Sequence, residues 1–195
     1  MNSEHIGRWF QDRGDSTLLL NYPLDEDSVV LDVGGYKGNW SASILDKYNP
    51  YICIFEPVKE FYEVCKNRFK DNPKITVLNY GFSNKHEEQT ICLCNDASAV
   101  SAEGACKVTL EDIATAITTK VDLISINIEG SEYNVLPRMI ESGIVKLCKY
   151  IQVQFHWKGV ENCVQMRDEV RRKLAETHTE TYCYPFVWES WRRNV

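Results

Sequence analysis

Glycines and an acidic residue stand where an α/β protein could bind a nucleoside. Residues 30–40 read Val-Leu-Asp-Val-Gly-Gly-Tyr-Lys-Gly-Asn-Trp, the pattern of a buried strand, a glycine-rich turn and a helix that begins near Asn39. Glycine lets the backbone turn sharply and approach a ligand closely, and the first N–H groups of a helix can bind an anionic group. Glu56 ends the next apolar run, so its carboxylate could accept two hydrogen bonds from ribose hydroxyls.

The spacing of the glycines separates three kinds of ligand. A phosphate-binding loop requires Lys after its last glycine, whereas Gly38 is followed by Asn39. A dinucleotide fingerprint requires G-x-G-x-x-G, which Gly34, Gly35 and Gly38 match poorly, and this argues against an NAD-dependent oxidoreductase. The order Asp-x-Gly-x-x-x-Gly, from Asp32 to Gly38, instead resembles the first motif of S-adenosylmethionine-dependent methyltransferases. The alternative is a plain turn between a strand and a helix.

Two candidate bases follow later apolar runs. Glu129 comes after residues 121–128, and His156 comes after residues 150–155. Transfer of a methyl group to a hydroxyl requires a positioned base, and either side chain could accept that proton. Each also has a structural alternative: Glu129 could be a helix N-terminal carboxylate stabilised by the helix dipole, and His156 a partly buried histidine bonded to the backbone. Glu132 is expected in the first turn of a helix.

Alternating strand and helix patterns position these residues. Near-continuous apolar runs predict strands buried on both faces, at residues 29–33, 51–55, 75–78, 121–128 and 150–155. Apolar residues at helical spacing predict four helices, through Ser41 to Tyr48, Phe61 to Phe69, Leu110 to Ile117 with Thr109 as its cap, and Cys163 to Leu174. This rhythm predicts a mostly parallel, twisted α/β sheet with helices on both faces. Residues 89–94 predict an extra strand, and residues 180–188 an antiparallel edge strand.

Length and composition fit one domain. The chain has 195 residues and a formal net charge of -6, which argues against a globally basic nucleic-acid-binding protein. We divide it into an N-terminal cap segment (1–27), a cofactor-binding core (28–157) and a C-terminal helix with an edge strand (158–195). No apolar run approaches 18 residues, and no secretory signal is seen, so we expect a cytoplasmic protein without a membrane span.

Eight cysteines raise the question of disulfides or a metal. Because several lie inside apolar runs, we expect reduced, buried thiols rather than bridges. Cys92 and Cys94 lack a second pair at ligand spacing, so we expect no structural metal.

Further motifs narrow the resemblance. In chain order they are Asp-Val-Gly-Gly-Tyr-Lys-Gly (32–38), Phe-Glu-Pro (55–57), Asn-Tyr-Gly-Phe-Ser-Asn (79–84), Thr-Leu-Glu-Asp-Ile (109–113) and Asn-Ile-Glu-Gly-Ser-Glu (127–132). As an ordered set they resemble the FkbM family of methyltransferases, over residues 28–157. The resemblance implies a Rossmann-like methyltransferase fold, S-adenosylmethionine as methyl donor, and a hydroxyl of a small molecule or sugar as the usual acceptor.

The resemblance also implies the cofactor-binding residues, which include the first motif, the ribose acid and a loop near the adenine. They are Asp32, Gly34, Gly35, Tyr36, Gly38, Glu56, Gly81, Phe82, Ser83 and Asn127.

Two residues depart from the family pattern. Tyr36 stands where the family commonly has Asn, and Asn127 stands where it has Asp. An amide cannot act as a base and holds a divalent cation poorly. The sequence therefore predicts an S-adenosylmethionine-dependent methyltransferase with Glu129 and His156 as candidate bases. The alternative is a catalytically silent module that binds the cofactor or S-adenosylhomocysteine as a partner or scaffold.

Overall fold

A seven-stranded, mostly parallel sheet forms the centre of the protein. The computed structural model describes residues 3–92 and 105–194. The sheet has the order β3-β2-β1-β7-β8-β10-β9, and its first five strands are parallel. The strands are β1 (Val29–Val33), β2 (Tyr51–Phe55), β3 (Ile75–Leu78), β7 (Val121–Ile126), β8 (Cys148–Val153), β9 (His178–Tyr184) and β10 (Trp188–Arg193). The predicted mostly parallel α/β sheet is confirmed.

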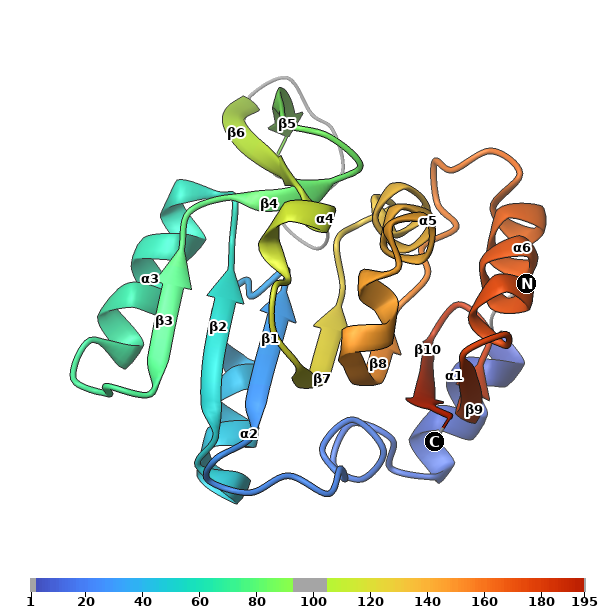
Figure 1. The fold of residues 1–195 in the computed structure, drawn as a ribbon, viewed down its shortest axis with the longest axis horizontal. Helices are drawn as coiled ribbons and strands as arrows, with labels where there is room; N and C mark the ends of the chain where they lie inside the picture. Colours follow the sequence, from blue (N-terminus) through green and yellow to red (C-terminus); the bar gives the residue numbers. More distant parts are fainter. Residues whose placement is uncertain (1–2, 93–104, 195) are drawn as a thin grey trace.

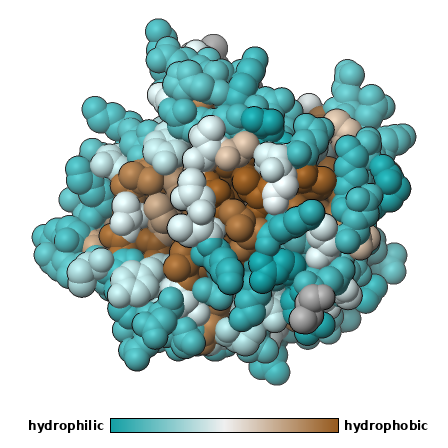
Figure 2. Space-filling model, in the orientation of Figure 1, coloured by the Kyte–Doolittle hydropathy of each residue, from teal (hydrophilic) through white to brown (hydrophobic). Residues whose placement is uncertain are grey.

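Helices cover both faces of this sheet (Figure 1). α2 (Asn39–Tyr48) and α3 (Lys59–Phe69) lie behind the sheet, whereas α4 (Ile113–Ala116) and α5 (Glu132–Ser142) lie in front. α6 (Cys163–Leu174) packs beside α5 and precedes the final hairpin. Apolar residues show through the middle of the front face in Figure 2, where the four-residue α4 covers little of the sheet.

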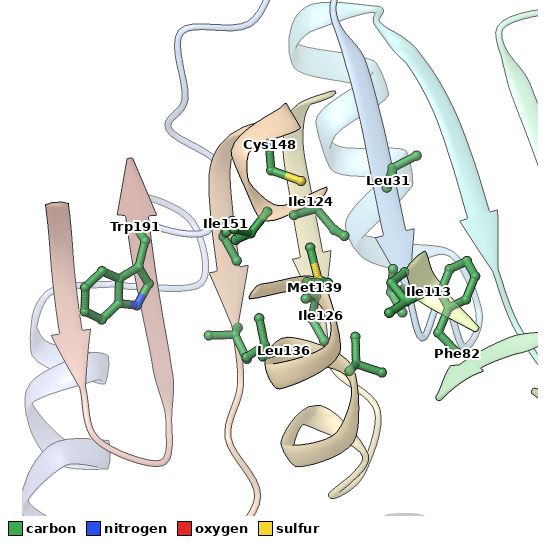
Figure 3. Close-up of a cluster of buried hydrophobic side chains, with 14 of the residues drawn as sticks. Leu31, Phe82, Ile113, Ile124, Ile126, Leu136, Met139, Cys148, Ile151 and Trp191 are labelled. Atoms are coloured by element: carbon green, nitrogen blue, oxygen red, sulfur yellow. The ribbon is translucent and has the colours of Figure 1, made fainter. Parts of the chain in front are cut away.

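The parallel strands are apolar on both sides because each side packs into a different core cluster. Leu31 and Val33 of β1 belong to the larger cluster, on the side of α4 and α5, while Val30 packs with residues of α2 and α3. Figure 3 shows the larger cluster, to which Leu136 and Met139 of α5 contribute. Burial on both faces explains why these strands read as continuous apolar runs rather than as alternating ones.

A small second sheet lies at the upper, carboxyl edge of the main sheet (Figure 1). It has the order β4-β6-β5, with β4 (Gly81–Ser83), β5 (Glu87–Cys92) and β6 (Ala105–Asp112). The extra strand predicted at 89–94 is confirmed through Cys92, and residues 93 and 94 lie outside the described residues. β4 packs on the turn after β2. Gly81 of β4 approaches Pro57 so closely that an added Cβ would lie 3.2 Å from a Pro57 side-chain carbon.

Three sequence-based predictions need correction. The helix expected from Leu110 to Ile117 forms only as α4 (Ile113–Ala116), because residues up to Asp112 belong to β6. Its cap is Asp112 rather than Thr109, and the Asp112 carboxylate accepts a hydrogen bond from the N–H of Ala114. The alternation of Cys106, Val108 and Leu110 suits a strand that pairs with β4 and β5.

The other two corrections concern the bounds of β7 and β8 and the form of the C-terminal tail. β7 ends at Ile126 rather than residue 128, and β8 lies two residues earlier than predicted. The tail forms a hairpin of two antiparallel strands, β9 and β10, instead of one edge strand, and the turn lies at residues 185–187. β10 pairs with β8, so the hairpin extends the parallel sheet.

The N-terminal helix α1 (Ser3–Gln11) is a packed cap. Trp9 is buried, contacts the rings of Tyr182 and Tyr184 in β9, and donates its indole N–H to Asp15 at 2.9 Å. Trp9 therefore joins the N-terminal segment to the opposite end of the chain, as a packed cap.

The structure bears only in part on two further expectations, reduced cysteines and the lack of a membrane span. Free thiols are found at Cys53, Cys65, Cys148, Cys163 and Cys183, and the reduced state of all eight cysteines stays a prediction. Across residues 3–92 and 105–194, no helix combines the length and the apolar character that a bilayer crossing requires.

Candidate functional site

The glycine-rich turn follows β1 at the carboxyl edge of the sheet. Gly34 and Gly38 have φ angles of +93° and +71°, a region that favours glycine. A Cβ added at Gly34 would lie 1.9 Å from the carbonyl oxygen of Asn127, so the loop passes directly against the end of β7. The structure thus brings the turn and Asn127 together, as the resemblance implied.

Glu56 is tied to this turn through the backbone. One carboxylate oxygen accepts the Tyr36 N–H at 2.7 Å, and the other accepts the Val58 N–H at 2.8 Å. Burial raises the pKa of Glu56 to about 7, although these two N–H groups lower it and only partly offset the burial. A desolvated carboxylate at the end of β2 is thereby held beside the glycines, with lone pairs remaining for hydroxyl donors.

Asp32 lies in β1, just before the turn, and is hydrogen-bonded to α2, which follows the turn. Its carboxylate accepts the hydroxyl of Ser41 in α2 at 2.5 Å, and the side chain is 5% exposed. Burial raises the pKa of Asp32 to about 6, against the Ser41 hydrogen bond. Such burial suits a residue that joins β1 to α2 better than one that contacts a ligand.

Tyr36 adopts a left-handed conformation that is uncommon for an aromatic residue. Its φ is +50°, and its backbone is held at both ends: the N–H donates to Glu56, and the carbonyl accepts the Cys65 thiol at 3.0 Å. The ring is 49% exposed and meets Phe61 edge to face, with a centroid distance of 4.3 Å. An aromatic surface therefore borders the glycine turn.

Asn127 presents a polar atom without a partner. Among the described residues, its Oδ1 is one of the few buried side-chain atoms that make no hydrogen bond. Buried acceptors are usually satisfied, so an orphaned one calls for an explanation such as a ligand. An N–H or O–H of a bound ligand at the glycine turn would supply the missing donor.

Glu129, Glu132 and His156 meet at the ends of β7 and β8. One ring nitrogen of His156 lies 2.9 Å from Glu132, and the other lies 3.3 Å from Glu129. Burial alone would lower the pKa of His156, but the two carboxylates outweigh it and raise that pKa to about 10. The prediction that Glu132 begins a helix is confirmed, since it is the first residue of α5.

This geometry revises the role expected of His156. At neutral pH the imidazole is protonated and both ring nitrogens face carboxylates, so neither can accept a proton from a substrate. Glu129, whose side chain is 37% exposed, is the better placed of the two candidate bases. The sequence signal that could have shown this was the second acidic residue, Glu132, three positions after Glu129.

The residues expected near the adenine form strand β4 rather than a loop. Phe82 is 1% exposed and packs on Phe55 and Tyr80, and the Ser83 hydroxyl donates to Glu87 at 2.8 Å. Their side chains thus support the edge from inside the core. Gly81 packs on Pro57 beside Glu56.

Two other features lie apart from these residues. Oxygen and sulfur atoms of Glu180, Cys183 and Glu189 lie within 4.8 Å of one another, but Arg167 and Arg171 already form ion pairs or hydrogen bonds with all three. A hollow of about 220 Å³ lies between the N-terminal segment and the strands β8 and β9; it is lined by Leu18, Asn21, Tyr22, Pro23, Tyr150, Thr181 and Tyr182. Neither includes a candidate residue.

Comparison with known families identifies one segment. Residues 103–178, which include Asn127, Glu129, Glu132 and His156, match the methyltransferase FkbM domain. The match covers less than half of the chain, so it shows a similarity of this segment to the FkbM methyltransferase domain. No curated protein matches the chain by sequence. The FkbM match covers the carboxyl ends of β7 and β8, whereas the glycine turn and Glu56 lie outside it.

Solved structures extend the fold beyond the FkbM segment. The FkbM methyltransferase of Methylobacillus flagellatus superposes with a TM-score of 0.60 at 14% identity, over 88% of this chain and 44% of that protein. The chain therefore spans less than half the length of that relative. An rRNA methylase from Streptococcus thermophilus (TM-score 0.53, 11% identity, 95% of both chains) and a fibrillarin pre-rRNA processing protein from Methanococcus jannaschii (0.54, 14%, 92% and 76%) share the fold. The Rossmann-like methyltransferase fold is confirmed.

Proposed function

We propose that this protein is an S-adenosylmethionine-dependent methyltransferase that methylates a hydroxyl of a small molecule or sugar. One observation carries the proposal: the carboxylate of Glu56 is hydrogen-bonded to the glycine turn at Tyr36, 2.7 Å away, at the edge where the FkbM segment places Glu129. A nucleoside-binding carboxylate and a candidate base thus share one edge of a parallel sheet, where α/β proteins bind their ligands.

The residues present fit this cofactor. Glu56 offers acceptor oxygens to ribose hydroxyls, the glycine turn offers backbone to the amino-acid end, and the unpartnered Oδ1 of Asn127 offers an acceptor to an ammonium or hydroxyl. Tyr36 and Phe61 add an aromatic border. When bound, S-adenosylmethionine supplies a methyl group activated by its sulfonium.

The protein's own residues then align the acceptor and remove its proton. Alignment of acceptor oxygen, methyl carbon and sulfur is the main requirement of an in-line displacement. In our proposal, one carboxylate oxygen of Glu129 takes the proton that the acceptor hydroxyl must lose. The other oxygen stays near the charged His156, at 3.3 Å, which orients the carboxylate.

Transfer of a radiolabelled methyl group tests the proposal. The assay offers S-adenosylmethionine with a panel of sugars and small hydroxylated molecules, and a matched panel of structured RNAs. Incorporation into a hydroxylated small molecule supports the proposal. Incorporation into RNA alone would place this protein with the rRNA methylases that share its fold, against the expectation from its net charge of -6.

A silent cofactor-binding module is the second candidate. The observation that favours it is Asn127, an amide where FkbM proteins carry Asp. If the wild-type protein binds S-adenosylhomocysteine yet transfers no methyl group to either panel, this candidate is preferred. An Asn127→Asp variant that gained transfer would identify the amide as the cause.

A further inference from the structure

We infer that the buried Glu132 is a positioning residue for Glu129 and acts on it through His156. The inference rests on the proposed function, because it concerns the same candidate base. Glu132 is fully buried, so it cannot touch an acceptor at the surface. Its influence on Glu129 must pass through groups that lie between them.

The first connection runs through the backbone. One carboxylate oxygen of Glu132 accepts the Ile128 N–H at 2.9 Å, and the other accepts the Gly130 N–H at 3.0 Å. Glu129 lies between these two residues with a φ of +53°, a conformation that is unfavourable for an L-residue. Strained residues of this kind persist only where their surroundings hold them. Glu132 holds the backbone on both sides of Glu129.

The second connection runs through the His156 ring. The oxygen of Glu132 that accepts the Ile128 N–H also lies 2.9 Å from Nδ1 of His156, and Nε2 faces Glu129 at 3.3 Å. Both ring nitrogens can donate only when the imidazole is protonated. The hydroxyl of Tyr133 donates to the carbonyl oxygen of His156 at 2.7 Å, so the start of α5 holds residue 156 by side chain and by backbone.

The two connections give Glu132 a distinct role. Its charge keeps His156 protonated, and the protonated ring holds one oxygen of Glu129 while the other remains for the acceptor. Glu129 and Glu132 are the carboxylates that raise the pKa of His156, and the nearby Tyr133 hydroxyl contacts only its backbone. Removal of the charge at position 132 should therefore release both the ring and the base.

Nitrogen NMR of the histidine rings tests this role directly. The protein has four histidines, and a His156→Gln variant assigns the signal of interest. We expect His156 in the wild type to remain protonated above pH 8. In Glu132→Gln the pKa of His156 should fall by about 1–3 units, the effect of removing a nearby opposite charge. The exposed Glu141, at the other end of α5, provides the matched control Glu141→Gln, which should leave that pKa unchanged.

Turnover adds a second readout. Glu132→Gln should lower kcat while leaving the affinity for S-adenosylhomocysteine unchanged, a split that general misfolding would not produce. If Glu132→Gln does not fold, Glu129→Gln tests the same connection from the exposed end. There, His156 should still titrate above its ordinary value, because Glu132 continues to face Nδ1.

Three results would overturn the inference: a wild-type His156 that titrates near its ordinary value, no change in Glu132→Gln, or a return to the ordinary value in Glu129→Gln. These outcomes are independent of the proposed function. If the wild type transfers no methyl group but His156 titrates as expected, the function fails and the positioning network stands.

Discussion

At the ends of β1 and β2, the acidic residues face only neutral donors, whereas at the ends of β7 and β8 they face a charged ring. Asp32 meets a serine hydroxyl, and Glu56 meets two backbone N–H groups. Burial therefore dominates there and raises the pKa of Glu56 to about 7. Glu129 and Glu132 instead share His156 and raise its pKa to about 10. The same side-chain type therefore meets neutral partners at one end, where we propose that Glu56 accepts ribose hydroxyls, and a charged ring at the other.

The largest effect is expected at Glu129, beside the charged ring of His156. Glu129→Gln keeps the shape of the side chain but cannot take a proton, so methyl transfer should slow by about 10²–10⁴-fold. The affinity for S-adenosylhomocysteine should stay nearly constant, because Glu129 lies outside the glycine turn. Turnover and binding measured on the same preparation, with Glu141→Gln as the control, check this. A wild-type rate in Glu129→Gln would mean that positioning alone carries the reaction.

The second largest effect is expected at Glu56, at the end of β2. Glu56→Ala removes an acceptor for ribose hydroxyls, and a hydrogen bond to a charged acceptor contributes about 1.5–3 kcal/mol. Each lost bond should weaken binding by about tenfold or more. Calorimetry with S-adenosylhomocysteine measures this, and Glu60→Gln, exposed on α3, is the control. Unchanged affinity would remove Glu56 from the site.

The stability contributions of Glu56 and His156 should be lost over different pH ranges. A carboxyl pKa raised to about 7 at Glu56 contributes stability that is present below its unfolded value and lost as pH rises through 7. The raised pKa of His156 contributes stability that is present below about pH 6.5 and lost as pH rises through about 10. Denaturant unfolding across pH should show both losses. Glu56→Gln should reduce the lower loss, to which the raised pKa of Asp32 also contributes, and His156→Gln should remove the upper one. A single shared loss would contradict the separation.

The affinity for S-adenosylhomocysteine should rise over the same pH range in which the lower loss of stability occurs. Ionised Glu56 is the better acceptor, so binding of S-adenosylhomocysteine should strengthen as pH rises through about 7. Calorimetry at a series of pH values checks this. Affinity that is flat between pH 6 and 8 would show that the ribose does not rely on this charge.

The smallest effect is expected at Tyr36. Its positive φ is strained, and Asn tolerates that conformation better, but Tyr36→Asn also loses the ring contact with Phe61. These opposite contributions should leave the free energy of unfolding within about 1 kcal/mol of the wild type. Chemical denaturation measures the change, and a loss of several kcal/mol would show that the ring, not the backbone, holds the turn.

Sequence patterns predicted the neutral end of the site better than the charged end. β1, β2 and β3 have the predicted bounds because each is a near-continuous apolar run that stops at a polar residue or glycine. Glu56 could be found because it directly follows such a run. The glycine turn and Glu56 are local features, and their spacing along the chain already places them at one edge.

The charged end depends on contacts that the linear pattern does not contain. His156 lies three residues beyond the end of β8, and the chain must fold back onto α5 before its ring meets Glu132. α5 itself was predicted only at its first turn, through Glu132, although Val135, Leu136 and Met139 lie at helical spacing and are buried. The end of β6 was assigned to the following helix because Leu110 lies at helical spacing from Ile113 and Ile117, and only the pairing of β6 with β4 and β5 shows that residues 110–112 are extended.

Calorimetric titration of the wild-type protein and Glu56→Ala with S-adenosylhomocysteine, with NAD as the competing ligand, tests the central claim most directly. We expect saturable binding of one S-adenosylhomocysteine per chain, weakened by about tenfold or more in Glu56→Ala, and no binding of NAD. Binding of NAD instead, or equal affinity of the two proteins for S-adenosylhomocysteine, would contradict a nucleoside site built from the glycine turn and Glu56.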